Sequence, residues 1–182
     1  MKFFLVFVGA LLLGVSIYAQ DVYSCRSTHL SFFSSSPLED IEAKTDKGVS
    51  AVNKKTRDIY FKVAINTFQF RKKLMQEHFN ENYLESDKFP FAEFRGKINE
   101  SPELNKDGTY PVTVTGALNI HGVSKMYTAK GTITTRGNVI TVSSTFNVRV
   151  ADHGIKIPSL VVQNVAEVVA VTVNAAYISI NN

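Results

Sequence analysis

Strict alternation of apolar and polar residues is the feature that most constrains how this chain can fold. In Asp58 to Asn66 the apolar face is formed by Ile59, Phe61, Val63 and Ile65. A period of two is typical of a half-buried antiparallel strand. The alternation returns in four later segments, residues 91–99, 110–120, 123–134 and 139–148. The chain is therefore predicted to be mainly antiparallel β structure.

Turn sequences separate the alternating segments. Polar or glycine-containing turns are predicted at residues 46–48, 53–58, 105–108, 121–122, 136–138 and 152–154. Further strands are predicted at residues 24–36, 49–53 and 165–180, and a loop is predicted to pass through Pro158. Consecutive strands joined by tight turns favour a meander that closes into an up-and-down barrel, since closure removes the exposed edges. An eight-stranded barrel of this kind can hold one small ligand.

One segment breaks the β pattern. Arg71 to Ser86 has no alternation, and its apolar residues Leu74, Met75, Phe79 and Leu84 fall near helical spacing. We predict one short helical insert that ends before Pro90.

The N-terminus resembles a cleavable signal peptide. Lys2 precedes an uncharged apolar run from Phe3 to Val15, and Ala19 supplies a small residue at the expected cleavage point. Residues 1–19 are therefore predicted to be a signal peptide and residues 20–182 a single domain, periplasmic or extracellular after cleavage. The alternative is a lipoprotein acylated at Cys25, although Asp21 and Tyr23 fit a lipobox poorly.

Composition argues against several classes of function. Cys25 is the only cysteine, so an internal disulfide is excluded. The net charge of +4 is mild and the basic residues are scattered, which argues against nucleic acid as a partner. The four histidines are far apart in sequence and no nucleophile motif is present, so we expect no metal, no cofactor and no catalysis. The 13 Phe residues indicate a bulky aromatic interior.

Three segments resemble the YceI family. The first and most specific runs from Phe61 to Ile98 and includes the insert with its sequence LMQEHFNENYLES and the following KFPFAEF. The second is GALNIHGVSK at residues 116–125, and the third runs from Phe146 to Pro158. The N-terminal strand departs from the family, because it lacks the tryptophan that many members carry there.

The resemblance implies an extended, lipocalin-like antiparallel β-barrel of about eight strands. It also implies non-enzymatic binding of an apolar lipid, a polyisoprenoid or fatty-acid derivative, inside that barrel. The strand alternation and the insert identify the candidate lining residues as Phe61, Val63, Ile65, Phe68, Leu74, Met75, Phe79, Phe94, Val114, Leu118 and Phe146.

Several alternatives stay open at this point. The aromatic insert is either a lid over a lipid-filled barrel or a plug in an ordinary core. A filled barrel would indicate a structural or partner-binding envelope module, and a small metal-dependent or serine hydrolase is a third hypothesis. The cluster Arg71, Lys72 and Lys73 is either a weak contact for the membrane surface or an ordinary solvated face. The protein could be a monomer or a homodimer.

Overall fold

A computed structural model describes residues 21–35, 40–157 and 167–178 of the chain. The predicted signal peptide and the predicted loop through Pro158 lie outside the described residues. The described elements, in chain order, are β1 (Val22–Ser34), β2 (Ile41–Asn53), β3 (Asp58–Ala64), η1 (Ile65–Thr67), β4 (Gln69–Phe70), α1 (Lys73–His78), η2 (Phe79–Tyr83), β5 (Phe91–Ile98), β6 (Gly108–Ile120), β7 (Val123–Arg136), β8 (Val139–Arg149), η3 (Val150–His153) and β9 (Val168–Ile178).

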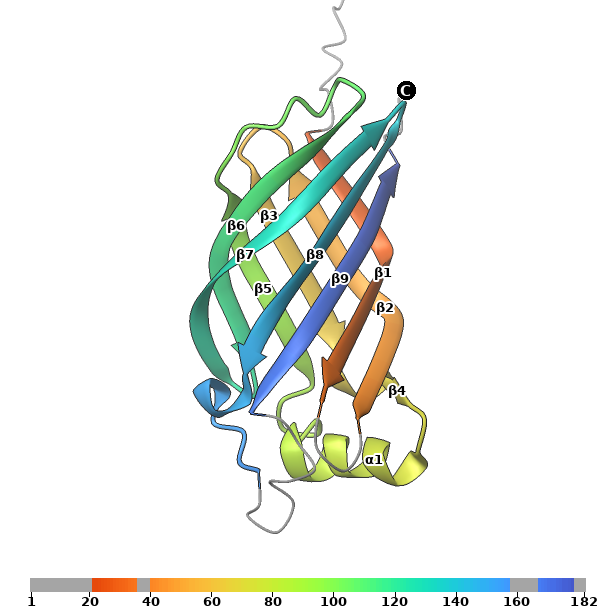
Figure 1. Ribbon diagram of the computed structural model, residues 1–182, viewed down its shortest axis with the longest axis vertical. Coiled ribbons are helices and arrows are strands. Elements are labelled where there is room, and N and C mark those ends of the chain that lie inside the picture. Colours follow the sequence, from red (N-terminus) through yellow and green to blue (C-terminus); the bar gives the residue numbers. More distant parts are fainter. Residues whose placement is uncertain (1–20, 36–39, 158–166, 179–182) are drawn as a thin grey trace, which may run out of the picture.

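Eight long strands of the described chain form a closed antiparallel barrel (Figure 1). Each strand pairs with its neighbours in sequence, and β1 pairs with both β2 and β9, which completes the cylinder. The predicted all-β, up-and-down barrel of about eight strands is therefore confirmed. The strands tilt steeply relative to the barrel axis, as closure of a sheet requires (Figure 1).

The helical insert covers one end of the barrel, drawn as the lower end in Figure 1. It consists of α1 followed directly by the single π-helical turn η2, so the predicted interruption of the β structure is confirmed. No residue of α1 or η2 is fully buried. The insert is therefore held by one partly buried face rather than by enclosure.

The turn predicted at residues 46–48 is wrong, because β2 runs through it without interruption. The turn-like sequence of residues 46–48 lies next to two bulges, one in each strand. Between the pairs Cys25–Ser50 and Thr28–Gly48 strand β1 carries one extra residue, and between Thr28–Gly48 and Leu30–Thr45 strand β2 carries one. The second bulge restores the register, but it shifts the inward positions of β2 from odd to even numbers.

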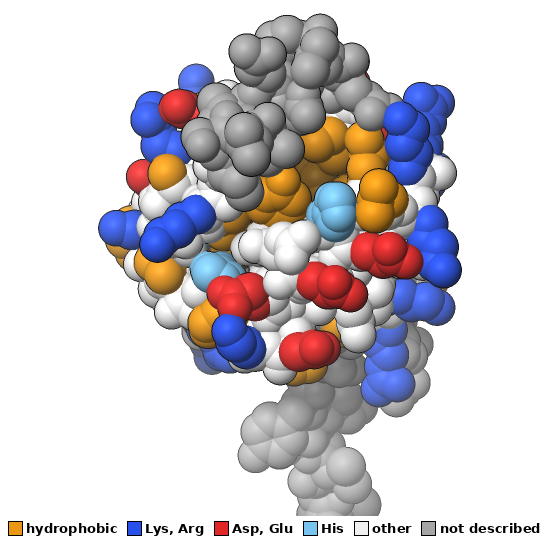
Figure 2. All heavy atoms as spheres, turned by 90° about the horizontal axis from the view of Figure 1, so that it is seen from below, with side chains coloured by type: hydrophobic (Ala, Val, Ile, Leu, Met, Phe, Trp, Pro, Cys, Tyr) orange, Lys and Arg blue, Asp and Glu red, His pale blue; other side chains and the backbone are white. Residues whose placement is uncertain are grey.

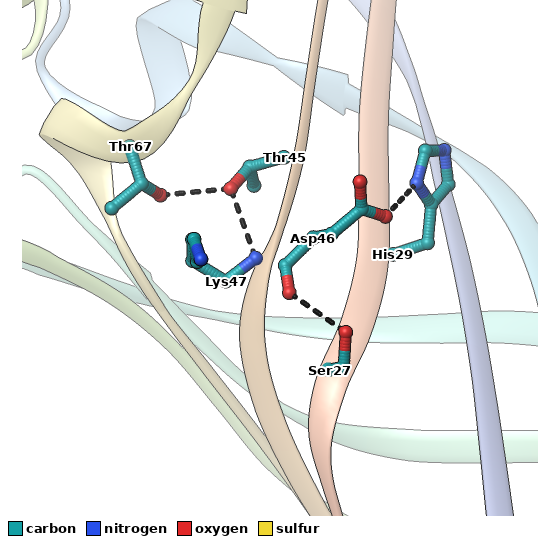
Figure 3. Close-up of polar contacts among 6 residues, drawn as sticks. All are labelled: Ser27, His29, Thr45, Asp46, Lys47 and Thr67. Carbon is teal, nitrogen blue, oxygen red and sulfur yellow. Dashed lines mark hydrogen bonds and ion pairs between the residues drawn. The ribbon is translucent and has the colours of Figure 1, made fainter.

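Polar contacts hold this bulged region together (Figure 3). The Ser27 hydroxyl donates to the backbone oxygen of Asp46 at 3.2 Å, and the Asp46 carboxylate lies 2.7 Å from Nδ1 of His29. Gly48 fits here because a β-carbon would lie 2.9 Å from the backbone oxygen of Thr28 and 2.3 Å from a methyl group of Leu30.

The strand predicted from Asp58 to Asn66 ends earlier in the structure, at Ala64. The chain turns through η1, and β4 then pairs with β2 instead of extending β3. The hydroxyls of Thr45 and Thr67 lie 3.0 Å apart across this junction (Figure 3). At this point β2 no longer pairs with β3 through its backbone, and a hydrogen bond between side chains links the two segments instead.

Candidate functional site

The barrel interior contains an apolar cavity of about 590 Å³. This volume lies within the range of small-molecule sites, roughly 300–1,000 Å³. Inward-facing residues of all eight strands and one face of the insert line it, chiefly Leu30, Phe32, Ile59, Phe61, Val63, Ile65, Phe68, Phe70, Met75, Phe79, Phe94, Val114, Leu118, Ala129, Ile133, Phe146, Val171 and Val173. The barrel is hollow in its lower part rather than filled by side chains.

Ten of the eleven candidate lining residues border this cavity. They are Phe61, Val63, Ile65, Phe68, Met75, Phe79, Phe94, Val114, Leu118 and Phe146. Leu74 does not border it, and its side chain is 61% exposed. One residue along a helix rotates a side chain by about 100°, so Met75 faces the interior and Leu74 faces away. The assignment of Leu74 to the lining is therefore corrected, and ligand contact by the other ten stays a prediction.

Packed side chains close the cavity at the upper end of the barrel as drawn in Figure 1. We call this closed end the floor of the cavity, although it is uppermost in that view. Five inward residues form it: Ile59, Ile98, Val112, Ile133 and Val142. Above the floor lies a second layer, the plug, which consists of Cys25, Val52, Ile140, Ala175 and Tyr177 and does not border the cavity.

Three buried hydroxyl groups stabilise the plug. The Tyr177 side chain is 0% exposed and its hydroxyl donates to Oγ of Ser50 at 2.9 Å. Oγ of Ser50 lies 2.7 Å from Oγ1 of Thr28. Burial raises the pKa of Tyr177 strongly, so the phenol stays protonated. Cys25 is 9% exposed, and attachment of a lipid to its thiol would disrupt this packing.

A cluster of four phenylalanines lies at the lower end. Phe32 of β1, Phe68, Phe70 of β4 and Phe79 of η2 have ring centroids 5.0–5.9 Å apart in five pairs. All four rings border the cavity, so they form part of its wall. Seen from below, apolar side chains are visible in a recess at this end, with histidine and charged side chains around it (Figure 2).

Polar contacts anchor the end of the insert to the barrel rim. Glu85 follows η2, and its carboxylate oxygen Oε2 accepts a hydrogen bond from Nε2 of His121 at 2.9 Å. Lys88 also hydrogen bonds to Glu85, and these two contacts, the lysine first, lower the pKa of the Glu85 carboxyl. His121 lies in the turn between β6 and β7, so the contact ties the insert to the sheet.

A second histidine is buried beside this anchor. Nδ1 of His153 donates to the backbone oxygen of Val123 at 3.0 Å, which leaves Nε2 to accept from the Tyr127 hydroxyl at 3.1 Å. Burial first, and the negative charge of Asp152 second, raise the pKa of Tyr127. Tyr127 borders the cavity, and it is thus held as a neutral phenol in the wall.

Comparison with known proteins identifies the family. The model of the YceI-like domain matches residues 24–177. The chain belongs to the YceI-like family. No curated protein matches it.

Solved structures share the fold of this YceI-like chain. A polyisoprenoid binding domain from Saccharophagus degradans, implicated in plant cell wall breakdown, aligns with a TM-score of 0.75 and 13% identity over 87% of this chain and 98% of that one. BcnA of Burkholderia cenocepacia aligns with a TM-score of 0.69 and 16% identity over 82% and 95%. The Campylobacter jejuni YCEI protein aligns with a TM-score of 0.56 and 12% identity over 97% of both chains. At these identities the likeness concerns the fold alone.

Sequence reasoning missed part of the lining of this YceI-like barrel. Leu30 and Phe32 of β1 and Val171 and Val173 of β9 border the cavity but were not among the candidates. The alternation of valines in residues 169–173 was a usable signal. In β1 the extra residue between Cys25 and Thr28 interrupts the corresponding pattern.

The basic cluster lies at the start of the insert. Arg71 and Lys72 precede α1, and Lys73, whose side chain is 92% exposed, pairs with Glu77 at 3.7 Å. Membrane contact by this cluster stays a prediction. In residues 21–35, 40–157 and 167–178, no three His, Cys, Asp or Glu side chains are grouped so that they could hold a metal ion. No helix in these same ranges has the length and apolar character needed to cross a membrane.

Proposed function

We propose that this YceI-like protein binds and carries an apolar lipid of the isoprenoid or fatty-acid type, without catalysis. The observation that carries the proposal is the apolar cavity of about 590 Å³ that reaches the lower end of the barrel. Burial of each methylene of a tail contributes roughly 0.8 kcal/mol, so an apolar tunnel can bind a long tail with few polar contacts.

Two further features support this proposal. The lining mixes four clustered phenylalanines with Met75, and methionine adapts its shape to irregular apolar ligands. A protein of similar fold from Saccharophagus degradans is described as a polyisoprenoid binding domain. We propose further that binding takes place after export, in the periplasm or outside the cell, in keeping with the signal-like sequence of residues 1–19.

The test is lipid extraction from the purified protein followed by mass spectrometry, combined with a pair of variants. Ala129 borders the cavity on β7, whereas Thr128 on the same strand is exposed. Ala129→Phe places a phenyl ring inside the cavity, and Thr128→Phe places one outside. We expect co-purified lipid to fall at least severalfold in Ala129→Phe and to stay at the wild-type level in Thr128→Phe.

Two results would contradict the proposal. One is the absence of lipid from the wild-type protein together with no binding of added fatty acid or isoprenoid alcohol. The other is equal lipid content in the two folded variants. Either result would favour a structural or partner-binding role for the barrel.

A further inference from the structure

The cavity is a blind tunnel within the described structure, and its two ends differ in chemistry. At the upper end it stops at the floor, where Ile98 and Ile133 are each only 1% exposed. At the lower end its wall includes polar side chains, among them His78 of α1 and Ser34 of β1. A molecule with one apolar tail and one polar head would therefore enter tail first.

The plug lies behind the floor and resists displacement. Ile133 pairs with Val142 in the sheet, and the next inward pair along β8 and β9 is Ile140 with Tyr177. The Tyr177 hydroxyl is fixed by its hydrogen bond to Ser50, which also contacts Thr28. To pass the floor, a tail would have to break these buried hydrogen bonds, and each buried polar group left without a partner opposes that movement.

The cavity volume gives the length of tail that fits. A methylene group is about as large as a water molecule, whose share of the liquid is roughly 30 Å³. A volume of 590 Å³ therefore has room for about 20 carbon atoms. This corresponds to a long fatty-acyl chain or to four isoprene units.

We propose that the floor sets the longest tail that this protein encloses, at about 20 carbons, and that Ile98 and Ile133 meet the terminal methyl group. The ligand class is a single-tailed amphiphile whose head stays at the lower end near His78. Longer tails bind no more tightly, because their additional carbons remain outside the cavity. This inference rests on the proposed function.

Binding of a chain-length series tests the proposal. Saturated fatty acids of about 12 to about 26 carbons, in steps of two, are titrated as competitors of a fluorescent fatty acid on the full barrel. The affinity for wild type is expected to rise by about three- to fourfold for each added methylene, until about 20 carbons, and then to level off. The length at which it levels off is the quantity of interest.

Variants of the floor then move that length. Ile133→Ala removes three carbons from the end of the tunnel, so the plateau is expected to begin about three carbons later, and Ile133→Val about one carbon later. Ile98→Ala provides a second site if Ile133→Ala does not fold. Leu74→Ala is the control, because Leu74 lies on the exposed side of α1 and does not border the cavity, and it is expected to leave the plateau length unchanged.

The outcomes separate the inference from the function on which it rests. Failure of every fatty acid and isoprenoid alcohol to bind would overturn the proposed function itself. Binding that keeps strengthening to about 26 carbons, or a plateau that does not move in folded Ile133→Val and Ile98→Ala, would overturn only the role of the floor. A plateau that shifts in Leu74→Ala as far as in Ile133→Ala would also overturn it.

Discussion

The hydrogen-bonded hydroxyls of Thr28, Ser50 and Tyr177 allow a sharp test of what holds the closed end of the barrel. Ser50 is the middle member, 2.7 Å from Thr28 and 2.9 Å from Tyr177. Ser50→Ala therefore leaves the hydroxyl groups of Thr28 and Tyr177 without this partner. Tyr177→Phe instead removes the phenol hydroxyl, and Ser50 keeps its contact with Thr28. A buried polar group left unpaired costs about 1–3 kcal/mol, and a typical hydrogen bond contributes about 0.5–1.5 kcal/mol.

These magnitudes predict a non-additive pair. Ser50→Ala is expected to lower the free energy of unfolding by about 2–4 kcal/mol, and Tyr177→Phe by about 1 kcal/mol. In the Tyr177→Phe background the serine substitution leaves only Thr28 unpaired, so it should cost about 1–2 kcal/mol. The double-mutant cycle is thus expected to give a coupling energy of about 1–2 kcal/mol.

Urea unfolding of the four proteins, analysed by linear extrapolation, measures these free energies. Thr145→Val is the control, since the hydroxyl of Thr145 contacts that of Thr172 at 3.0 Å on the exposed side of the sheet. Water replaces a lost bond there, and the change should stay within about 0.5 kcal/mol. Additivity of the two buried substitutions within about 0.5 kcal/mol would refute the reasoning.

Two further predictions concern the wall and the rim. Gly116→Ala should destabilise the barrel by about 1–3 kcal/mol or more in the same unfolding assay. The reason is that the new β-carbon would lie 2.4 Å from the backbone oxygen of Arg95 and 2.4 Å from Cα of Gly96. An unchanged midpoint of unfolding would contradict this. The lowered pKa of Glu85 implies stability that is present above pH 4.5, the ordinary pKa of the group, and is lost as the pH falls through the lower value in the folded protein. The stability difference between wild type and Glu85→Gln should therefore shrink on acidification below pH 4.5, and a difference that is constant with pH would argue against the contacts with Lys88 and His121.

Local alternation carried most of the fold prediction, and tertiary pairing explains where it failed. The inward faces of β3 and β6 follow directly from sequence, since their side chains alternate without interruption. Strand β2 could not be read in this way, because a bulge opposite Thr28 shifts its inward positions at Gly48. A bulge depends on the partner strand, which local sequence does not specify.

The cavity was predictable in composition but not in depth. Ten of the candidates chosen from the alternation and from the insert border the cavity, whereas Leu74 on the short helix does not. Whether inward residues meet across the barrel depends on register and tilt. Ile133 closes the tunnel, whereas Ala129, four residues earlier on the same strand, leaves it open. This difference became visible only when the eight strands were assembled.

The pairing of β1 with β9 has a consequence for how the protein matures. Residues 29–33 of β1 pair with residues 170–174 of β9, so β1 cannot complete its pairing before β9 is present. A chain that emerges from the ribosome N-terminus first cannot close its cylinder until residues 170–174 have been made, and contacts of such long sequence separation form slowly. Until then one edge of β1 keeps a row of unpaired backbone groups, and such an edge can pair with another chain. A truncation that ends before Val168 should accumulate as a chaperone-bound or aggregated species, even though most of the wall has already been made.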